Sequence, residues 1–139
     1  MTTELEKIRT YAEAAPVSKW LGFSADMVGD ETFFFLKFAE HHIGNAMIRA
    51  LHGGAIATFL EFAAGAKLNA ALDPASEVAT VNTDIEYLSS ASADDMTARV
   101  RLIRIGRRLA FVEAVGWQSD ENTPVAIGHF RFRIGTPSK

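Results

Sequence analysis

A histidine, two glycines and a glutamate are the residues of this chain whose types and spacing suggest chemistry. His52, Gly53 and Gly54 precede an apolar segment, and Glu61 is the only charged residue between Gly53 and Ala66. The first N–H groups of a helix lack partners and lie at the positive end of its dipole, and glycines let a ligand approach them closely. A helix that begins here therefore offers donors for a negative oxygen and, about two turns later, a carboxylate.

The face of the predicted helix that carries Glu61 is built mostly from small residues. At helical spacing this face includes Gly54, Ala57, Thr58, Ala64, Gly65 and Leu68. The larger Ile56, Phe59 and Phe62 are expected to point elsewhere, which leaves Glu61 in a shallow hollow. Two interpretations are open from these residues: close packing with Glu61 paired to an arginine, or a site where the acid has a function.

The elements that must position these residues are a short helix, two strands, a long helix and four further strands. The helices are expected at residues 5–14, within an N-terminal segment of about 3–15, and at 53–72. The strands are expected at 23–28, 32–38, 80–87, 97–105, 109–118 and 125–134. Residues 33–36 are apolar on both faces, which predicts a strand buried on both sides.

Hairpins at residues 106–107 and 119–123 favour an antiparallel sheet, and a single apolar helix favours a sheet that wraps around it. We therefore predict one α+β domain over residues 1–139 with the hot-dog fold, a curved antiparallel sheet wrapped around one long central helix. Along residues 80–87 polar and apolar side chains alternate, so Thr80 and Asn82 are expected on the same polar face. A sheet of this size covers one side of the helix, and the small residues on the other side suggest a partner subunit.

The composition excludes several classes of function. The chain has 139 residues and no cysteine, which rules out a disulfide framework, a thiolate nucleophile and cysteine-ligated metals. The net charge of −3 gives no reason to expect nucleic acid or an acidic membrane as a partner. The longest apolar run is too short and too charged to span a bilayer, and residues 1–7 lack the features of a signal peptide, so we expect a cytoplasmic protein. His129 has no acid or second histidine nearby in its strand, so we expect no metal.

The pattern Asn45, His52-Gly53-Gly54 and Glu61 resembles that of the PaaI-like acyl-CoA thioesterases of the hot-dog superfamily. These proteins typically carry an asparagine a few residues before His-Gly-Gly and an acid nine positions after the histidine, which is the spacing from His52 to Glu61. Residues 80–88 resemble the central strand of that family. Residues 106–110 resemble its Gly-Arg/Lys hairpin, and residues 111–117 and 126–133 resemble the strands that follow. The resemblance covers residues 21–134.

The resemblance implies hydrolysis of an acyl-CoA thioester without a cofactor. Glu61 would act as general base or nucleophile, the N–H of Gly53 would hold the thioester carbonyl oxygen, and Gly54 would contact the substrate. His52 is a possible base, but the sequence favours a role in capping or orienting the turn. Asn45 lies seven residues before His52, where many family members have six. Two roles therefore stay open for it: reaching the site, or only stabilising a turn.

The resemblance also implies a dimer or a dimer of dimers, in which a strand of the partner subunit completes the site. Thr80 and Asn82 are candidates to contact the substrate, the alternative being a solvated strand face. Seven of the 14 basic residues lie between Arg99 and Arg133, and we expect the hairpin residues Arg107 and Arg108 to bind the CoA phosphates unless they are ordinary surface arginines.

The same fold allows two other functions. A non-catalytic protein that binds acyl-CoA or another acyl ligand is the main alternative, because a fold does not fix a function. A dehydratase is disfavoured, since the predicted helix contains neither a histidine nor a second acid.

Overall fold

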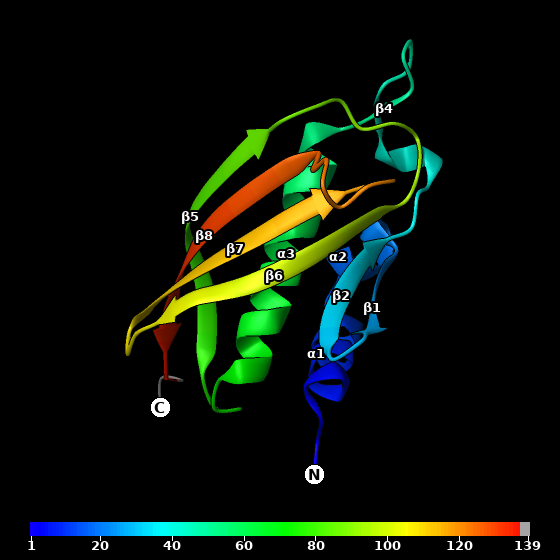
Figure 1. Ribbon diagram of the computed structural model, residues 1–139. Helices are drawn as coiled ribbons and strands as arrows, with labels where there is room; N and C mark the ends of the chain where they lie inside the picture. Colours follow the sequence, from blue (N-terminus) through cyan, green and yellow to red (C-terminus); the bar gives the residue numbers. More distant parts are fainter. Residues whose placement is uncertain (137–139) are drawn as a thin grey trace.

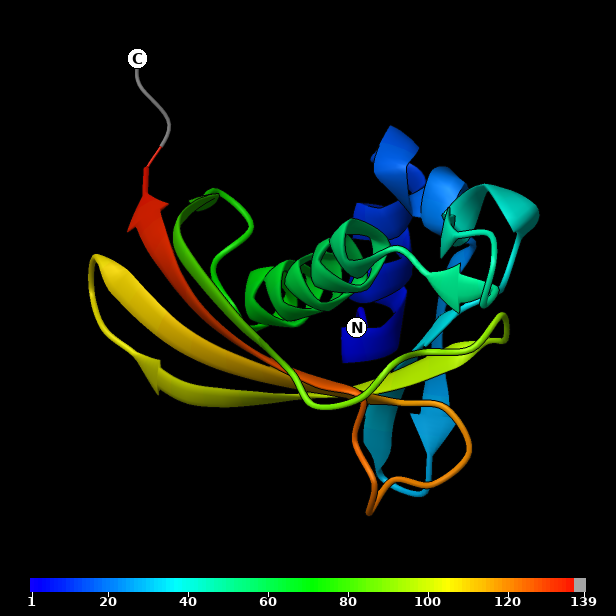
Figure 2. The same ribbon diagram turned by 90° about the horizontal axis from the view of Figure 1, so that it is seen from above.

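Helix α3 (Gly53–Ala71) lies in the concave face of a six-stranded antiparallel sheet in the computed structural model, which describes residues 1–136 (Figures 1 and 2). The strands follow one another in space as β1 (Phe23–Val28), β2 (Glu31–Leu36), β6 (Met96–Ile105), β7 (Leu109–Trp117), β8 (Ala126–Gly135) and β5 (Glu77–Tyr87). The predicted architecture, a curved antiparallel sheet around one long helix, is confirmed. No helix among residues 1–136 is long and apolar enough to cross a membrane.

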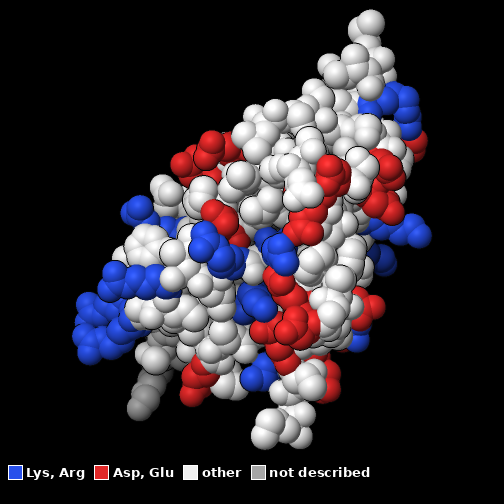
Figure 3. Space-filling model, in the orientation of Figure 1, with Lys and Arg blue, Asp and Glu red and all other residues white. Residues whose placement is uncertain are grey.

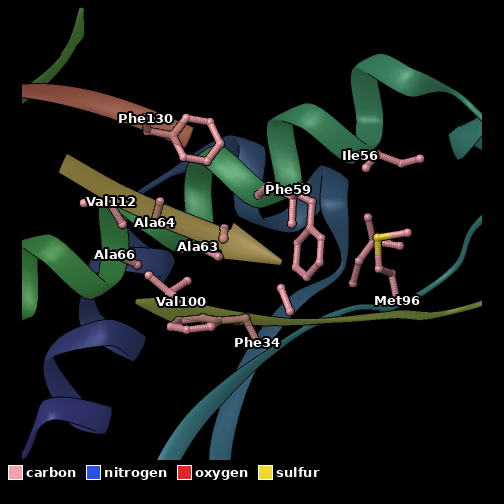
Figure 4. Packing of buried hydrophobic residues seen from close by; sticks show 14 of the residues in the cluster. Phe34, Ile56, Phe59, Ala63, Ala64, Ala66, Met96, Val100, Val112 and Phe130 are labelled. Carbon is pink, nitrogen blue, oxygen red and sulfur yellow. The ribbon is translucent and has the colours of Figure 1, made fainter. Parts of the chain in front are cut away.

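The core lies between α3 and the inner face of the sheet. Figure 4 shows Phe59 of α3 among side chains of the sheet, including Phe34 of β2 and Met96 of β6. On β6, β7 and β8 every second residue is buried over most of the strand, which is the pattern of a sheet with one face against a core. Burying each large side chain stabilises the fold by about 1.5–3 kcal/mol, so this layer holds α3 at a fixed position over the sheet.

Two helices precede the sheet, although only one was predicted. Helix α1 (Glu4–Glu13) matches the expected segment, and its Glu4 accepts a hydrogen bond from Lys67 of α3 at 2.7 Å. The expected helix ends before Pro16, and Pro16 is instead the first residue of a second helix, α2 (Pro16–Leu21). Proline is favoured at this position because its missing N–H has no partner at a helix start in any case.

Strand β2 is buried on one face only, so the prediction of burial on both faces is wrong. Phe34 and Leu36 face the core, whereas Phe33 and Phe35 are half-buried on the outer face. The ring of Phe33 lies 5.7 Å from that of Trp117, so a neighbouring aromatic shields part of its outer surface. An apolar outer face therefore reflects local aromatic packing on the sheet and not a second core.

Residues 39–51, for which no helix or strand was expected, have structure of their own. It contains a short 3-10 helix (Glu40–His42) and a two-stranded ladder formed by β3 (Ile43–Asn45) and β4 (Ala50–Leu51). Figure 1 shows the connection between these strands extending beyond the end of α3 where that helix begins. The ladder leads directly into the start of α3.

The edge strand β5 contains a β-bulge that changes which of its side chains face α3. Thr80 lies opposite Phe132 of β8, but the register then shifts, so that Asn82 lies opposite Arg131. The additional residue is Val81, and one additional residue reverses the alternation of faces beyond it. Thr80 and Asn82 therefore lie on opposite faces, and the prediction that they share one face is wrong.

Candidate active site

Glu61 lies half-buried in the middle of α3 and accepts two hydrogen bonds from β5. The Thr80 hydroxyl donates to one carboxylate oxygen at 3.2 Å, and the Thr83 hydroxyl donates to the other at 3.3 Å. None of the ion pairs found within residues 1–136 includes Glu61, so the described residues supply no arginine partner for it. Neutral donors orient this carboxylate, and its charge has no cationic partner among the described residues.

Thr83 is a site residue that the sequence pattern missed. It lies opposite the buried Phe130 and therefore faces α3, whereas Asn82 faces the outer side of the sheet and lines a separate groove of about 450 Å³. Strand alternation predicts the wrong face for Asn82, and Thr83 takes the place beside Glu61. Periodicity alone carries no signal for a bulge, which is why the pattern could not identify Thr83.

A hollow of about 120 Å³ lies next to Glu61, bounded by residues of α1, α2 and α3 and of the strands β5 and β8. Besides Glu61 and Thr80, it is lined by Tyr11, Val17, Thr58, Phe62, Gly65, Val78 and Phe132. The shallow hollow predicted around the acid is thus confirmed, but the expectation that Phe62 points away from it is wrong. Phe62 follows Glu61 by about 100° around the helix, and the hollow is wide enough to include both side chains.

The start of α3 is organised by His52. Its ring nitrogen Nδ1 accepts a hydrogen bond from the Gly54 N–H at 2.8 Å, so the orienting contact predicted for His52 is present. This contact occupies the Gly54 N–H. The Gly53 N–H stands at the first helical position and has no hydrogen-bond partner within residues 1–136.

Tyr87 of β5 closes one side of the helix start. Its hydroxyl donates to the Gly53 carbonyl at 2.6 Å, and a Cβ atom at Gly53 would lie only 3.3 Å from the tyrosine ring. The close approach of this ring accounts for a glycine at position 53. Tyr87 is a second contact of the candidate site that the sequence pattern did not predict.

Asn45 stabilises a turn in the structure. Its side-chain oxygen accepts hydrogen bonds from the Met47 N–H at 3.1 Å and the Ile48 N–H at 3.4 Å. Of the two roles left open by the sequence, the turn is the one for which contacts are present. An asparagine that bonds the backbone two residues later is a common way to build such a turn.

Arg107 and Arg108 lie in the hairpin between β6 and β7, as predicted, and Figure 3 shows basic side chains gathered over this end of the sheet. With Arg133 of β8 they line an open pocket of about 600 Å³. Leu109 at the end of the hairpin lies opposite Arg133, and Arg133 lies opposite Ala79, the neighbour of Thr80. The hairpin is therefore about two strand spacings, or about 10 Å, from the strand position that contacts Glu61.

The outer face of the sheet carries an ion pair that the linear sequence did not suggest. His129 was expected to have no acid nearby, but its Nε2 lies 3.0 Å from a carboxylate oxygen of Glu113 on the adjacent strand β7. Across residues 1–136, no three histidine, aspartate or glutamate side chains are grouped so that they could hold a metal ion.

The candidate oxyanion donor, the Gly53 N–H, and the carboxylate of Glu61 are separated along the helix. Gly53 and Glu61 are eight residues apart, which corresponds to about 12 Å along the axis. A reacting carbonyl must lie about 3 Å from both its attacking group and its N–H donor. One α3 helix therefore cannot apply both groups to the same carbonyl.

Comparisons with known proteins give a consistent family. A model of the thioesterase superfamily matches residues 49–125. A solved structure described as belonging to the thioesterase superfamily is 27% identical, has a TM-score of 0.85, and the match covers 95% of this chain and 98% of that one. No curated protein matches the sequence.

Two further solved structures show the same fold at lower identity. A phenylacetic acid degradation-related protein from Ralstonia eutropha is 21% identical with a TM-score of 0.77, over 90% of this chain and 96% of that one. A thioesterase from Haemophilus influenzae is 18% identical with a TM-score of 0.83, over 98% of this chain and 93% of that one. The expected hot-dog fold is confirmed.

Proposed function

Because this chain belongs to the thioesterase superfamily, we propose that it hydrolyses an acyl-CoA thioester to the free acid and CoA. Family and fold support thioester hydrolysis in general. The observation that carries the finer proposal is the lone carboxylate of Glu61, held by two hydroxyls at the edge of a hollow large enough for an acyl group.

Glu61 starts the reaction in one of two ways. As a general base it takes a proton from water, whose oxygen attacks the thioester carbon. As a nucleophile it attacks that carbon itself and forms an anhydride that water then cleaves. In both cases the C–S bond breaks and the CoA sulfur leaves as a thiolate that takes up a proton. The hydroxyls of Thr80 and Thr83 keep the carboxylate in one orientation, which favours attack from a fixed direction.

The negative charge that develops on the carbonyl oxygen needs a donor, and the first N–H of α3 at Gly53 is the proposed one. The separation of about 12 Å between Gly53 and Glu61 requires that this donor come from a second copy of the chain. We therefore propose a two-fold dimer in which each site combines Glu61 of one protomer with Gly53 of the other. Pairing of two such dimers is compatible with the same site.

The CoA phosphates are proposed to bind at the hairpin arginines. Arg107, Arg108 and Arg133 converge on one open pocket, and arginine binds phosphate oxygens in bidentate fashion. These phosphate contacts lie far from the reacting carbon. Their binding energy is therefore expected to affect KM more than kcat.

Replacing Glu61 by glutamine tests the function, because the amide keeps the shape of the side chain but lacks the basic oxygen. We expect kcat for acyl-CoA hydrolysis to fall by about two orders of magnitude or more, with KM little changed. Glu61→Asp should keep part of the activity. The matched control is Glu86→Gln, an exposed acid on β5 that should behave like the wild type.

Near-full activity of Glu61→Gln would reject the role of this acid. Binding of acyl-CoA by the wild type without any turnover would instead favour the acyl-ligand binding protein that the fold also allows.

A further inference from the structure

Tyr11, a residue of the N-terminal helix α1, lines the hollow next to Glu61. Its hydroxyl reaches over Gly65 so closely that a Cβ atom at position 65 would lie 3.2 Å from the hydroxyl oxygen. Gly65 stands one helical turn beyond Glu61 on the same face of α3. The Tyr11 ring packs against Phe62 with 5.3 Å between ring centroids. Tyr11 therefore forms the wall of the hollow on the side of Glu61 that leads away from the start of α3.

Tyr11 acts in this wall as a neutral, bulky group. Burial raises the pKa of its hydroxyl, and the negative charge of Glu61 raises this pKa further. A neutral phenol beside a carboxylate supplies volume and a hydrogen-bond donor, but no competing base. The other contributors to this end of the hollow, Val17, Val78 and Phe132, are apolar.

The size of the hollow limits what can lie in it. Its volume of about 120 Å³ is close to that of an apolar cavity of about 150 Å³ that holds one benzene molecule. An acyl group whose carbonyl carbon is at Glu61 thus has room for about one six-membered ring, or a chain of about six carbons, before it meets the tyrosine.

We propose that Tyr11 determines substrate specificity by closing the acyl end of the hollow, so that compact acyl groups are accepted and long straight chains are rejected. The proposal rests on the proposed function, because it takes Glu61 as the group at the reacting carbon. It adds that α1, outside the segment matched by the family model, selects the substrate.

A series of straight-chain acyl-CoA substrates from two to twelve carbons tests this on the wild type, Tyr11→Ala and Tyr11→Phe. The readout is the ratio of kcat/KM for decanoyl-CoA to kcat/KM for butyryl-CoA. In the wild type we expect this ratio to be about 0.1 or lower. In Tyr11→Ala it should rise by about tenfold or more, since pocket contacts of one or two methylenes change kcat/KM by about that factor. Tyr11→Phe keeps the ring and should keep the wild-type ratio.

The same ratio in Tyr11→Ala as in the wild type would overturn the proposal, and so would a wild type that prefers decanoyl-CoA. Circular dichroism checks whether Tyr11→Ala is folded. If it is not, Tyr11→Leu replaces it in the test, with a smaller expected shift in the ratio.

A second readout separates this proposal from the proposed function. Calorimetric binding of butyryl-CoA and decanoyl-CoA to Glu61→Gln, with and without Tyr11→Ala, measures length selection without hydrolysis. Suppose that the wild type turns over no acyl-CoA, but its preference for binding butyryl-CoA over decanoyl-CoA still depends on Tyr11. This result contradicts the hydrolase and supports the role of Tyr11. If turnover depends on Glu61 but the preferred chain length does not depend on Tyr11, the hydrolase is supported and the role of Tyr11 is contradicted.

Discussion

At the scale of single residues, the two hydroxyls on Glu61 decide how well its carboxylate is aimed. Both threonines lie on β5 and both face α3. They can do so although they are three positions apart, because the bulge at Val81 reverses the alternation of faces between them. Without the additional residue, Asn82 would face α3 instead. A local irregularity of the backbone thus selects which side chains support the acid.

Thr83→Val keeps the branched shape of the side chain and removes the donor. We expect kcat to fall by about threefold to tenfold, because one hydrogen bond to a partly exposed carboxylate is worth about 1 kcal/mol. Asn82→Ala, one position earlier on the opposite face, should stay within about twofold of the wild type. Steady-state kinetics on one acyl-CoA compares the two variants, and a larger loss in Asn82→Ala than in Thr83→Val would contradict the assignment of faces.

The residues of the candidate site were predictable where they share one helix and unpredictable where they depend on tertiary contacts. His52, Gly53 and Glu61 lie on one continuous segment, so their spacing fixes their relative positions. Tyr11 and Thr83 come from other elements, and no periodicity relates them to Glu61.

At the scale of elements, Glu4 links α1 to two other elements, α3 and β2. Its carboxylate accepts hydrogen bonds from Lys67 of α3 at 2.7 Å and from Thr32 of β2 at 2.9 Å. Burial alone would raise the pKa of Glu4, but the bonds from Lys67 and Thr32 outweigh it and lower the pKa below the usual 4.5. The contact that holds α1 therefore also holds Tyr11 over Gly65.

Glu4→Gln should lower Tm at pH 7, and the difference from the wild type should shrink as the pH falls below 4.5. A carboxyl whose pKa is lower in the folded state stabilises the protein above its unfolded pKa, and this stabilisation is lost as the pH falls through the folded pKa. Thermal unfolding from pH 7 to pH 3 measures the effect. Glu6→Gln, in the same first turn and without an ion pair in the described structure, is the matched control and should show no such pH-dependent gap.

The β6–β7 hairpin gives an independent prediction about the CoA moiety. Replacing both Arg107 and Arg108 by alanine should raise KM for acyl-CoA by about threefold to tenfold with little change in kcat. The increase should shrink at high salt, because salt screens exposed charges. An acyl-N-acetylcysteamine thioester, which lacks the nucleotide, should be hydrolysed equally by both forms. Equal losses on both substrates would mean that these arginines are structural.

The elements themselves could be predicted more completely than the contacts between them. Each expected strand is present, because alternating or continuous apolar runs separated by turn residues are strong local signals. Helix α2 was missed because a proline usually ends a helix, whereas Pro16 begins one.

At the scale of the whole molecule, one copy of the chain cannot form the proposed site alone, because its Glu61 and its Gly53 N–H cannot reach the same carbonyl. The edge strand β5 leaves one row of backbone groups unpaired, and its Tyr87 is 51% exposed although it contacts the helix start. A second copy of the chain is the proposed partner for this side. Sedimentation should therefore give a dimer or larger species at micromolar concentration, and an active monomer would contradict the shared site.

Mixing two inactive variants tests the shared site directly. Gly53→Pro removes the N–H at the first helical position, where proline is tolerated, and His52 before it already has the extended ψ of 132° that a following proline favours. Gly53→Ala is the matched control, because it adds a Cβ atom against Tyr87 but keeps the N–H. Gly53→Pro and Glu61→Gln should each be nearly inactive alone.

In a mixed dimer of these two variants, one site combines both defects, and the other combines an intact Gly53 with an intact Glu61. Co-expression should therefore restore activity, to about a quarter of the wild type in the whole mixture when the protomers assort at random, and to about half in the mixed dimers isolated through two affinity tags. If each site were built within one protomer, every site would carry one defect and the mixed dimer would stay inactive. Rescue by mixing depends only on where the donor and the acid come from, so it distinguishes the two arrangements even if both variants are somewhat less stable than the wild type.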